Sequence, residues 1–105
     1  VYGKGAQYVT SVKHDVTGYS TLKLRCIKTK NAGQSENVDT WVQFGIANSQ
    51  NSNWVNGGFI ASKSIPNNAN EQILTLDISK FTGDYYVSIG IYSWYTVQVF
   101  DFWLE

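Results

Sequence analysis

The chain has 105 residues, with eight basic and eight acidic side chains and therefore no net charge. That balance argues against non-specific nucleic-acid binding and against polybasic attachment to a membrane, because both need an excess of Lys and Arg. The length predicts a single domain over 1–105, and a start without methionine is consistent with a piece cut from a larger protein or with a processed chain, of which we expect the piece. Hydrophobic residues make up 43% of the chain, which is enough for one packed core.

Alternating apolar and polar residues, separated by Gly, Asn, Asp and Ser clusters, predict strands along the whole chain. The first expected strand is a weak alternation at Gln7–Lys13, and Thr17-Gly18 marks a turn within Asp15–Tyr19. The next strand is Ser20–Lys28. One of its faces carries Leu22, Leu24 and Cys26, and the other carries Thr21, Lys23 and Arg25.

The middle of the chain contains one clear strand and two polar loops. Polar residues at Lys30–Asp39 and Asn48–Asn56 predict loops, and Trp54 lies in the second loop. Between them, Thr40–Ala47 is a strand. Its apolar face has Val42, Phe44 and Ile46, and its opposite face has Trp41, Gln43, Gly45 and Ala47. An irregular strand is expected at Gly57–Ile65, ended by Pro66 because proline cannot donate to a ladder.

Three strands are expected in the last third, at Glu71–Ile78, Asp84–Trp94 and Thr96–Leu104. The second is the clearest alternation in the chain. Val87, Ile89 and Ile91 share one face, and Tyr86, Ser88, Gly90, Tyr92 and Trp94 share the other. In the third strand the apolar parity switches near Phe100, which predicts either a bulge or burial on both faces.

About seven short strands with turn signals between them predict an all-β fold of two packed antiparallel sheets. We expect a β-sandwich of the jelly-roll type. An immunoglobulin-type sandwich is less favoured, because the chain has one cysteine and cannot form the usual disulfide of those domains.

Several strand sequences resemble those of jelly-roll domains similar to carbohydrate-binding modules. The resemblance rests on Tyr19–Leu24, Trp41–Ile46, Leu74–Ser79 and Gly83–Ile91. Such domains occur in tail, baseplate and cell-wall-targeting proteins of phages and prophages of Gram-positive bacteria. The resemblance implies a sandwich that recognises a surface saccharide and an extracellular or virion-surface location. It does not assign individual ligand residues.

Residues suited to catalysis are few. His14 is the only histidine, so a metal site of several His ligands is excluded, and Cys26 lies in an apolar alternation typical of a buried thiol. Glycosidases use paired carboxylates, but Asp77 and Asp101 within strands are better explained as structural residues. We therefore expect no enzyme activity and no cofactor. A structural calcium ion stays open as an alternative, although no Asp-rich loop supplies its ligands.

The predicted binding residues combine rings with polar groups on faces opposite the core. Aromatic residues make up 15% of the chain, more than a small core easily hides. Sugar rings stack on such side chains, and small neighbours such as Gly45 and Gly90 could hollow a groove beside them. The polar partners would include Ser88 if the strands are neighbours. The candidates are Trp41, Gln43, Trp54, Tyr92, Trp94, Lys23 and Arg25. Each has a structural alternative, namely burial of the ring or a solvated strand face for the cations.

These observations predict a non-catalytic domain that binds a bacterial cell-surface or cell-wall polysaccharide. A polysaccharide or oligosaccharide is the expected partner, with no nucleic acid and no membrane insertion. Two alternatives remain. One is a structural or oligomerisation module of a phage fibre or baseplate, in which exposed rings would contact other subunits. The other, ranked last, is a small glycan-active enzyme.

Overall fold

The computed structural model describes residues 2–3, 7–30, 42–50, 59–91 and 95–105. In these ranges every regular element is a strand. The strands are β1 (Tyr2–Gly3), β2 (Gln7–Val9), β3 (His14–Asp15), β4 (Thr21–Lys30), β5 (Val42–Ala47), β6 (Phe59–Ser64), β7 (Asn68–Asp77), β8 (Asp84–Ile91) and β9 (Tyr95–Leu104). The described part of the chain contains no helix that could cross a membrane.

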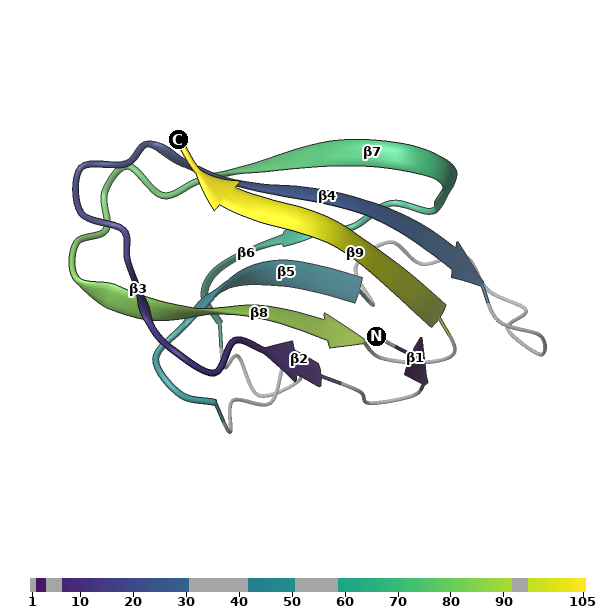
Figure 1. Cartoon of the computed structure of the whole chain (residues 1–105), viewed down its shortest axis with the longest axis horizontal. Helices are drawn as coiled ribbons and strands as arrows, with labels where there is room; N and C mark the ends of the chain where they lie inside the picture. Colours follow the sequence, from purple (N-terminus) through teal and green to yellow (C-terminus); the bar gives the residue numbers. More distant parts are fainter. Residues whose placement is uncertain (1, 4–6, 31–41, 51–58, 92–94) are drawn as a thin grey trace.

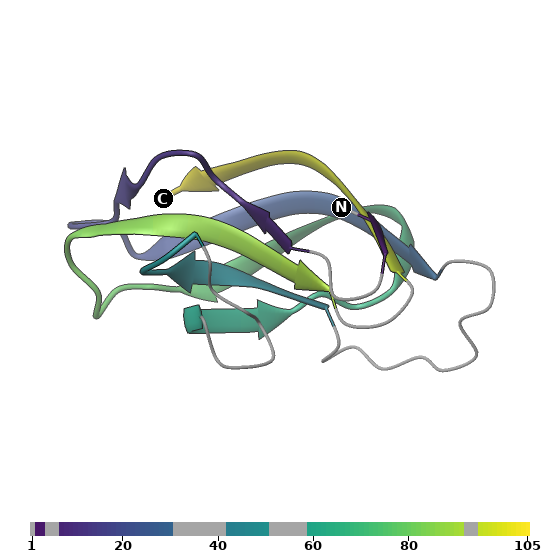
Figure 2. The same cartoon turned by 90° about the horizontal axis from the view of Figure 1, so that it is seen from below.

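The strands form two antiparallel sheets that pack face to face (Figures 1 and 2). One sheet has the order β1-β9-β4-β7. The other has the order β2-β8-β5-β6, and β3 pairs with β8 beyond the end of β2. Apart from the β5–β6 hairpin, the chain moves from one sheet to the other between successive main strands, which is the connectivity of a jelly roll. The predicted two-sheet sandwich is confirmed.

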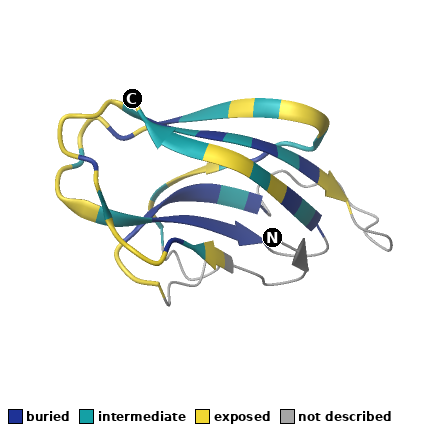
Figure 3. Cartoon of the chain, in the orientation of Figure 1, coloured by how far each residue is buried: buried dark blue, intermediate teal, exposed yellow. Residues whose placement is uncertain are grey.

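The core lies between the sheets and is built from the inward faces of the long strands. Val42, Phe44 and Ile46 of β5 are buried, as the alternation predicts. The predicted inward faces of β4 and β8 are confirmed in the same way, by the burial of Leu22, Leu24, Cys26, Val87, Ile89 and Ile91. Figure 3 shows β5 and β8 as the most continuously buried strands.

The boundaries differ most from the sequence-based expectation in two strands. The strand expected at Gln7–Lys13 ends at Val9, because the Thr10 hydroxyl accepts the bond from the Val87 N–H at 3.1 Å. The Thr10 carbonyl instead accepts a bond from the Gln50 side-chain amide at 2.9 Å, so the ladder stops there. At the other sheet, β7 begins at Asn68, three residues before the expected Glu71.

The expected bulge in the last strand is confirmed at Phe100. Arg25 pairs with Asp101 and Cys26 pairs with Val99, which leaves Phe100 as the extra residue on β9. The extra residue reverses the parity of the strand. Val97 and Val99 face the core before the bulge, and Phe102 and Leu104 face it afterwards. One inserted residue thus lets both halves of β9 contribute apolar side chains to the core.

One cation is buried inside the sandwich, at the end of the inward alternation of β4. Lys28 is fully buried, and its Nζ donates a hydrogen bond to the Ile65 carbonyl at 2.6 Å. The ammonium also lies 4.5 Å from the centroid of the buried Tyr95 ring, within the range of a cation–π contact. Lys28 is therefore a structural residue and does not face a ligand from solvent.

Candidate functional site

The outer face of the four-stranded sheet carries the predicted cations Lys23 and Arg25. On β4 these residues alternate with the buried core residues, so they point away from the core. The cross-strand partners of Lys23 are Thr75 on β7 and Trp103 on β9. Directly paired residues share a face, so Trp103 also points outward beside Lys23. This surface is called the β4–β9 face below and consists of Lys23, Arg25, Phe100, Asp101 and Trp103.

Acidic side chains partly neutralise both cations of the β4–β9 face. The Lys23 Nζ lies 3.5 Å from Glu105 Oε2, and the Arg25 Nε lies 3.7 Å from Glu71 Oε1. Glu105 Oε2 also accepts a 3.1 Å hydrogen bond from the Trp103 indole N–H, which fixes the polar edge of the ring. Two positive charges therefore lie near three carboxylates, those of Glu71, Glu105 and the cross-strand partner Asp101.

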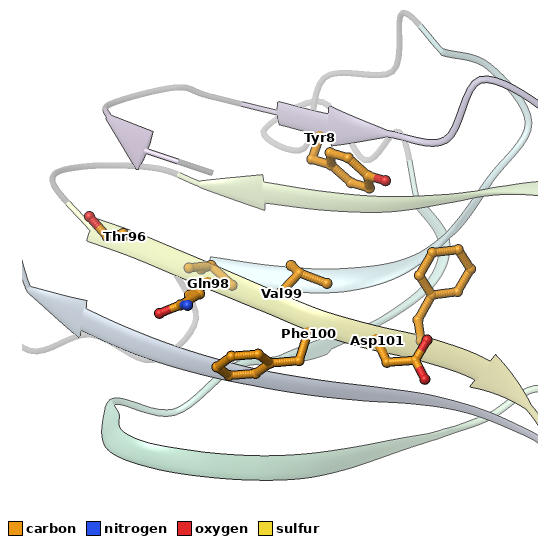
Figure 4. A pocket seen from close by; sticks show the side chains of 8 residues that line it. Tyr8, Thr96, Gln98, Val99, Phe100 and Asp101 are labelled. Carbon is orange, nitrogen blue, oxygen red and sulfur yellow. The ribbon is translucent and has the colours of Figure 1, made fainter.

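The bulge adds a second ring to the β4–β9 face. The Arg25 guanidinium lies 6.0 Å from the centroid of the Phe100 ring, and Phe100 keeps 41% of its surface exposed. Figure 4 shows Phe100 and Val99 projecting from opposite sides of β9. Phe100 and Trp103 thus place two rings along the outward side of β9, with Arg25 and Lys23 on the neighbouring strand.

A groove runs beside the same strand, between β9 and Tyr8 of β2 (Figure 4). It has a volume of about 670 Å³ and is lined by Tyr8 and by seven consecutive residues of β9, 96–102. Tyr8 keeps 42% of its surface exposed. At the far end of that run, His14 packs edge-on against the Phe102 ring, with 5.5 Å between ring centroids. Asp101 is the one charged residue among those lining the groove.

The outer face of the five-stranded sheet differs from the predicted open groove. Gln43, Gly45 and Ala47 of β5 pair with Gly90, Ser88 and Tyr86 of β8, so the two strands share this face as expected. Its centre is closed, however, because Gly45, Ala47, Ser88 and Gly90 are all buried. The expectation that Ser88 offers an exposed polar group to a ligand is therefore wrong.

The predicted binding residues do not form one cluster. Gln43 is on β5, where its side-chain oxygen accepts a hydrogen bond from the Ser62 hydroxyl at 2.7 Å. Lys23 and Arg25 are on β4, in the other sheet, so their strands are not neighbours of β5. They therefore point outward on the opposite side of the sandwich from Gln43. The remaining four predicted residues, Trp41, Trp54, Tyr92 and Trp94, lie outside the described residues.

The sequence interpretation missed Trp103, Phe100 and Tyr8 as candidate ligand contacts. A signal for Trp103 was present, because a bulge at Phe100 makes the residue between Phe102 and Leu104 point outward. Tyr8 carries no such signal. Its contact with the groove depends on β2 lying opposite β9 across the two sheets, which local alternation does not encode.

The described residues offer little to a catalytic mechanism. Burial raises the pKa of the Cys26 thiol to about 11, so the nucleophilic thiolate is scarce at neutral pH. Asp77 is bound within its own turn, because the hydroxyl and the amide N–H of Ser79 donate to Oδ1 at 2.7 and 2.9 Å. No group of three or more His, Cys, Asp or Glu side chains in the described ranges could hold a metal ion. The absence of enzyme activity stays a prediction.

Comparison with known protein families, curated proteins and solved structures finds no match to this chain.

Proposed function

We propose that the domain is a non-catalytic saccharide-binding module and that the β4–β9 face is its binding surface. The observation that carries the proposal is the position of the Trp103 and Phe100 rings on the outward side of β9, beside Lys23 and Arg25. A sugar ring has apolar C–H patches and a rim of hydroxyls, so it needs an aromatic surface with polar groups beside it. The proposal places the domain where such a ligand is met, outside the cell or on a virion surface.

The charges on this face indicate a neutral saccharide. Lys23 and Arg25 contribute two positive charges, whereas Glu71, Asp101 and Glu105 contribute three negative charges. A strongly anionic polysaccharide would meet a net negative surface and would lose affinity through repulsion. A neutral glycan would instead use the ion-paired side chains as hydrogen-bond partners. Its affinity should then change little between low and moderate salt concentrations.

The test is a glycan array that includes bacterial cell-wall polysaccharides, followed by calorimetric titration of the best ligand. Trp103→Ala should weaken binding at least about fivefold, because one buried aromatic contact commonly contributes more than 1 kcal/mol. Arg25→Gln should weaken it less, since it retains part of the hydrogen-bonding capacity. Alanine variants of four further predicted residues test whether their rings extend the same site. These residues are Trp41, Trp54, Tyr92 and Trp94.

Tyr8→Ala is the matched control, because Tyr8 is a half-exposed ring outside the β4–β9 face. It should leave saccharide affinity within about twofold of the native chain. Loss of binding in Tyr8→Ala with full binding in Trp103→Ala would instead place the saccharide in the groove. Failure of the native domain to bind any saccharide or bacterial surface would refute the function itself.

A further inference from the structure

We infer that the edge of β9 from Gln98 to Phe102 is a strand-addition site. In this arrangement an extended polypeptide segment lies antiparallel to β9 in the groove beside Tyr8 and extends the four-stranded sheet. The inference concerns the backbone edge of the strand, whereas the proposed saccharide contacts are side chains on its outward face. The two sites share Phe100 and Asp101, which belong to the β4–β9 face and also line the groove. The inference does not depend on the saccharide proposal.

The shape of the groove shows that it follows the edge of β9. Successive side chains of a strand point to opposite faces, so a groove that only covered one face would contact alternate residues. This groove instead contacts every residue of 96–102. The groove therefore follows the backbone of β9 over seven residues, a length of roughly 20 Å.

The backbone of β9 beside the groove has no strand partner in the described part of the chain. β4 pairs with one edge of β9 along almost its whole length. On the other edge, β1 pairs only with Tyr95 and Thr96. From Gln98 to Leu104 no described strand continues that pairing. An edge of this kind presents a row of N–H and C=O groups that can template an added strand.

Two other edges of the sandwich, at β7 and beside β8, are better protected. On β7, the Lys63 ammonium covers the edge by donating to the Thr75 carbonyl at 2.9 Å. In the five-stranded sheet, the edge beside β8 is formed by β2 and β3, which have three and two residues. β9 has ten residues and contains no Lys, Arg or Pro. Its protection is limited to the bulge at Phe100 and the Asp101 carboxylate.

The occupant is identified by three features of the groove. β1 already pairs antiparallel with the start of this edge, so an added strand with the same direction continues an existing interface. Val99 and Phe102 pack against the core beside the groove and favour apolar side chains at alternate positions of that strand. Asp101 favours a Lys or Arg next to it. The partner is therefore an extended segment that alternates apolar and polar residues and carries a basic side chain.

A second copy of the chain is a poorer occupant. If β9 paired antiparallel with β9 of another molecule about the middle of Gln98–Leu104, the two Asp101 residues would lie opposite each other. Like charges on neighbouring strands are destabilising, and the cross-strand cation Arg25 is already ion-paired with Glu71.

The test uses a synthetic peptide of alternating Thr and Val with one central Lys, blocked at both ends. Amide hydrogen exchange of the full chain is followed by NMR with and without this peptide. Exchange should slow at alternate amides of Gln98–Phe102, and the edge of β7 should stay unchanged. Methylation of the peptide nitrogens that face β9 should abolish the effect, whereas methylation on the opposite peptide edge should preserve it.

The charge of Asp101 allows a second measurement, which compares the affinities of two peptides for the same folded chain. The Lys peptide should bind about two- to fivefold more tightly than a matched Glu peptide, as expected for an exposed ion pair. Asp101→Asn should remove that preference. Unchanged exchange on β9, or equal protection of the β7 edge, would overturn the inference. Protection that rises with protein concentration alone would assign the edge to a second copy of the chain and would also overturn the inference.

Discussion

The outer faces of the two sheets differ in the solvent exposure of their side chains, although both sheets are built from strands with the same alternating pattern. On the five-stranded sheet the outward residues at the centre are small, and Gly45, Ala47 and Ser88 are buried. On the four-stranded sheet the outward residues of β4 and β9 include long and aromatic side chains, and Lys23 and Trp103 keep part of their surface exposed. Figure 3 shows the contrast as dark β5 and β8 against the banded β4 and β9.

This contrast teaches that an outward face is not automatically a binding face. Alternation assigns each side chain to a side of its sheet, but accessibility depends on how closely neighbouring chain segments approach. At Gly45 the approach is so close that an added Cβ would overlap the Ala61 carbonyl oxygen and lie 2.8 Å from Ser62 Cα. Gly45 therefore allows β5 and β6 to pack closely, and the prediction that it hollows a ligand groove is wrong.

The largest expected effect comes from Phe102→Ala, because the bulge at Phe100 places Phe102 against the core and Trp103 on the outer face. An unbroken alternation from Val97 and Val99 would instead turn Trp103 inward and Phe102 outward. We expect Phe102→Ala to lose about 3 kcal/mol in the free energy of unfolding, measured in urea. Trp103→Ala, at the neighbouring outward position, should cost about 1 kcal/mol or less. Equal losses in the two variants would contradict the assigned register.

Gly45→Ala should produce the next largest effect. The new methyl group meets backbone atoms of β6, which cannot rotate away as a flexible side chain could. We expect a loss of about 2 kcal/mol, although alanine is normally preferred over glycine within a strand. Thr75→Ala is the control at an outward position of the four-stranded sheet and should change stability by about 0.5 kcal/mol or less. Equal effects of the two substitutions would remove the contrast between the faces.

A smaller effect is expected from acid, through two carboxylates that accept hydrogen bonds within their own turns. Donation from Ser79 lowers the pKa of Asp77, and donation from Thr17 lowers the pKa of Asp15, both below the ordinary value of 3.8. A lowered pKa in the folded state stabilises the fold above that ordinary value, and this stabilisation is lost as the pH falls through the folded-state pKa. Urea unfolding should therefore show lower stability near pH 2.5 than near pH 5. The double substitution Asp15→Asn with Asp77→Asn should reduce that difference, and an unchanged difference would assign it to other carboxylates.

The sequence predicts the architecture well because the strands carry regular alternation. The inward faces of β4, β5 and β8 and the bulge at Phe100 all follow from local patterns that a single strand encodes. The early end of β2 does not. It depends on the Thr10 hydroxyl replacing a backbone acceptor opposite Val87, a contact between residues 77 positions apart.

The candidate site is less predictable, because it depends on which strands become neighbours. Gln43 and Arg25 each lie on an outward face as expected, but β5 and β4 belong to different sheets. Lys28 continues the apolar face of its strand and is buried, which composition alone would not indicate for a lysine. The cross-strand positions of Trp103 and Tyr8 become visible only once the register and the packing of the sheets are known.

The most direct test of the account is NMR mapping of a bound saccharide on the full chain. Titration of the best array ligand should shift the backbone amides of Lys23, Arg25 and Asp101 and the indole N–H of Trp103, which lies on the same face. Amides of Gln43 and Ser62 on the opposite sheet should remain in place. Shifts concentrated at Gln43 and Ser62, with the Trp103 indole unmoved, would contradict the assignment of the β4–β9 face as the binding surface.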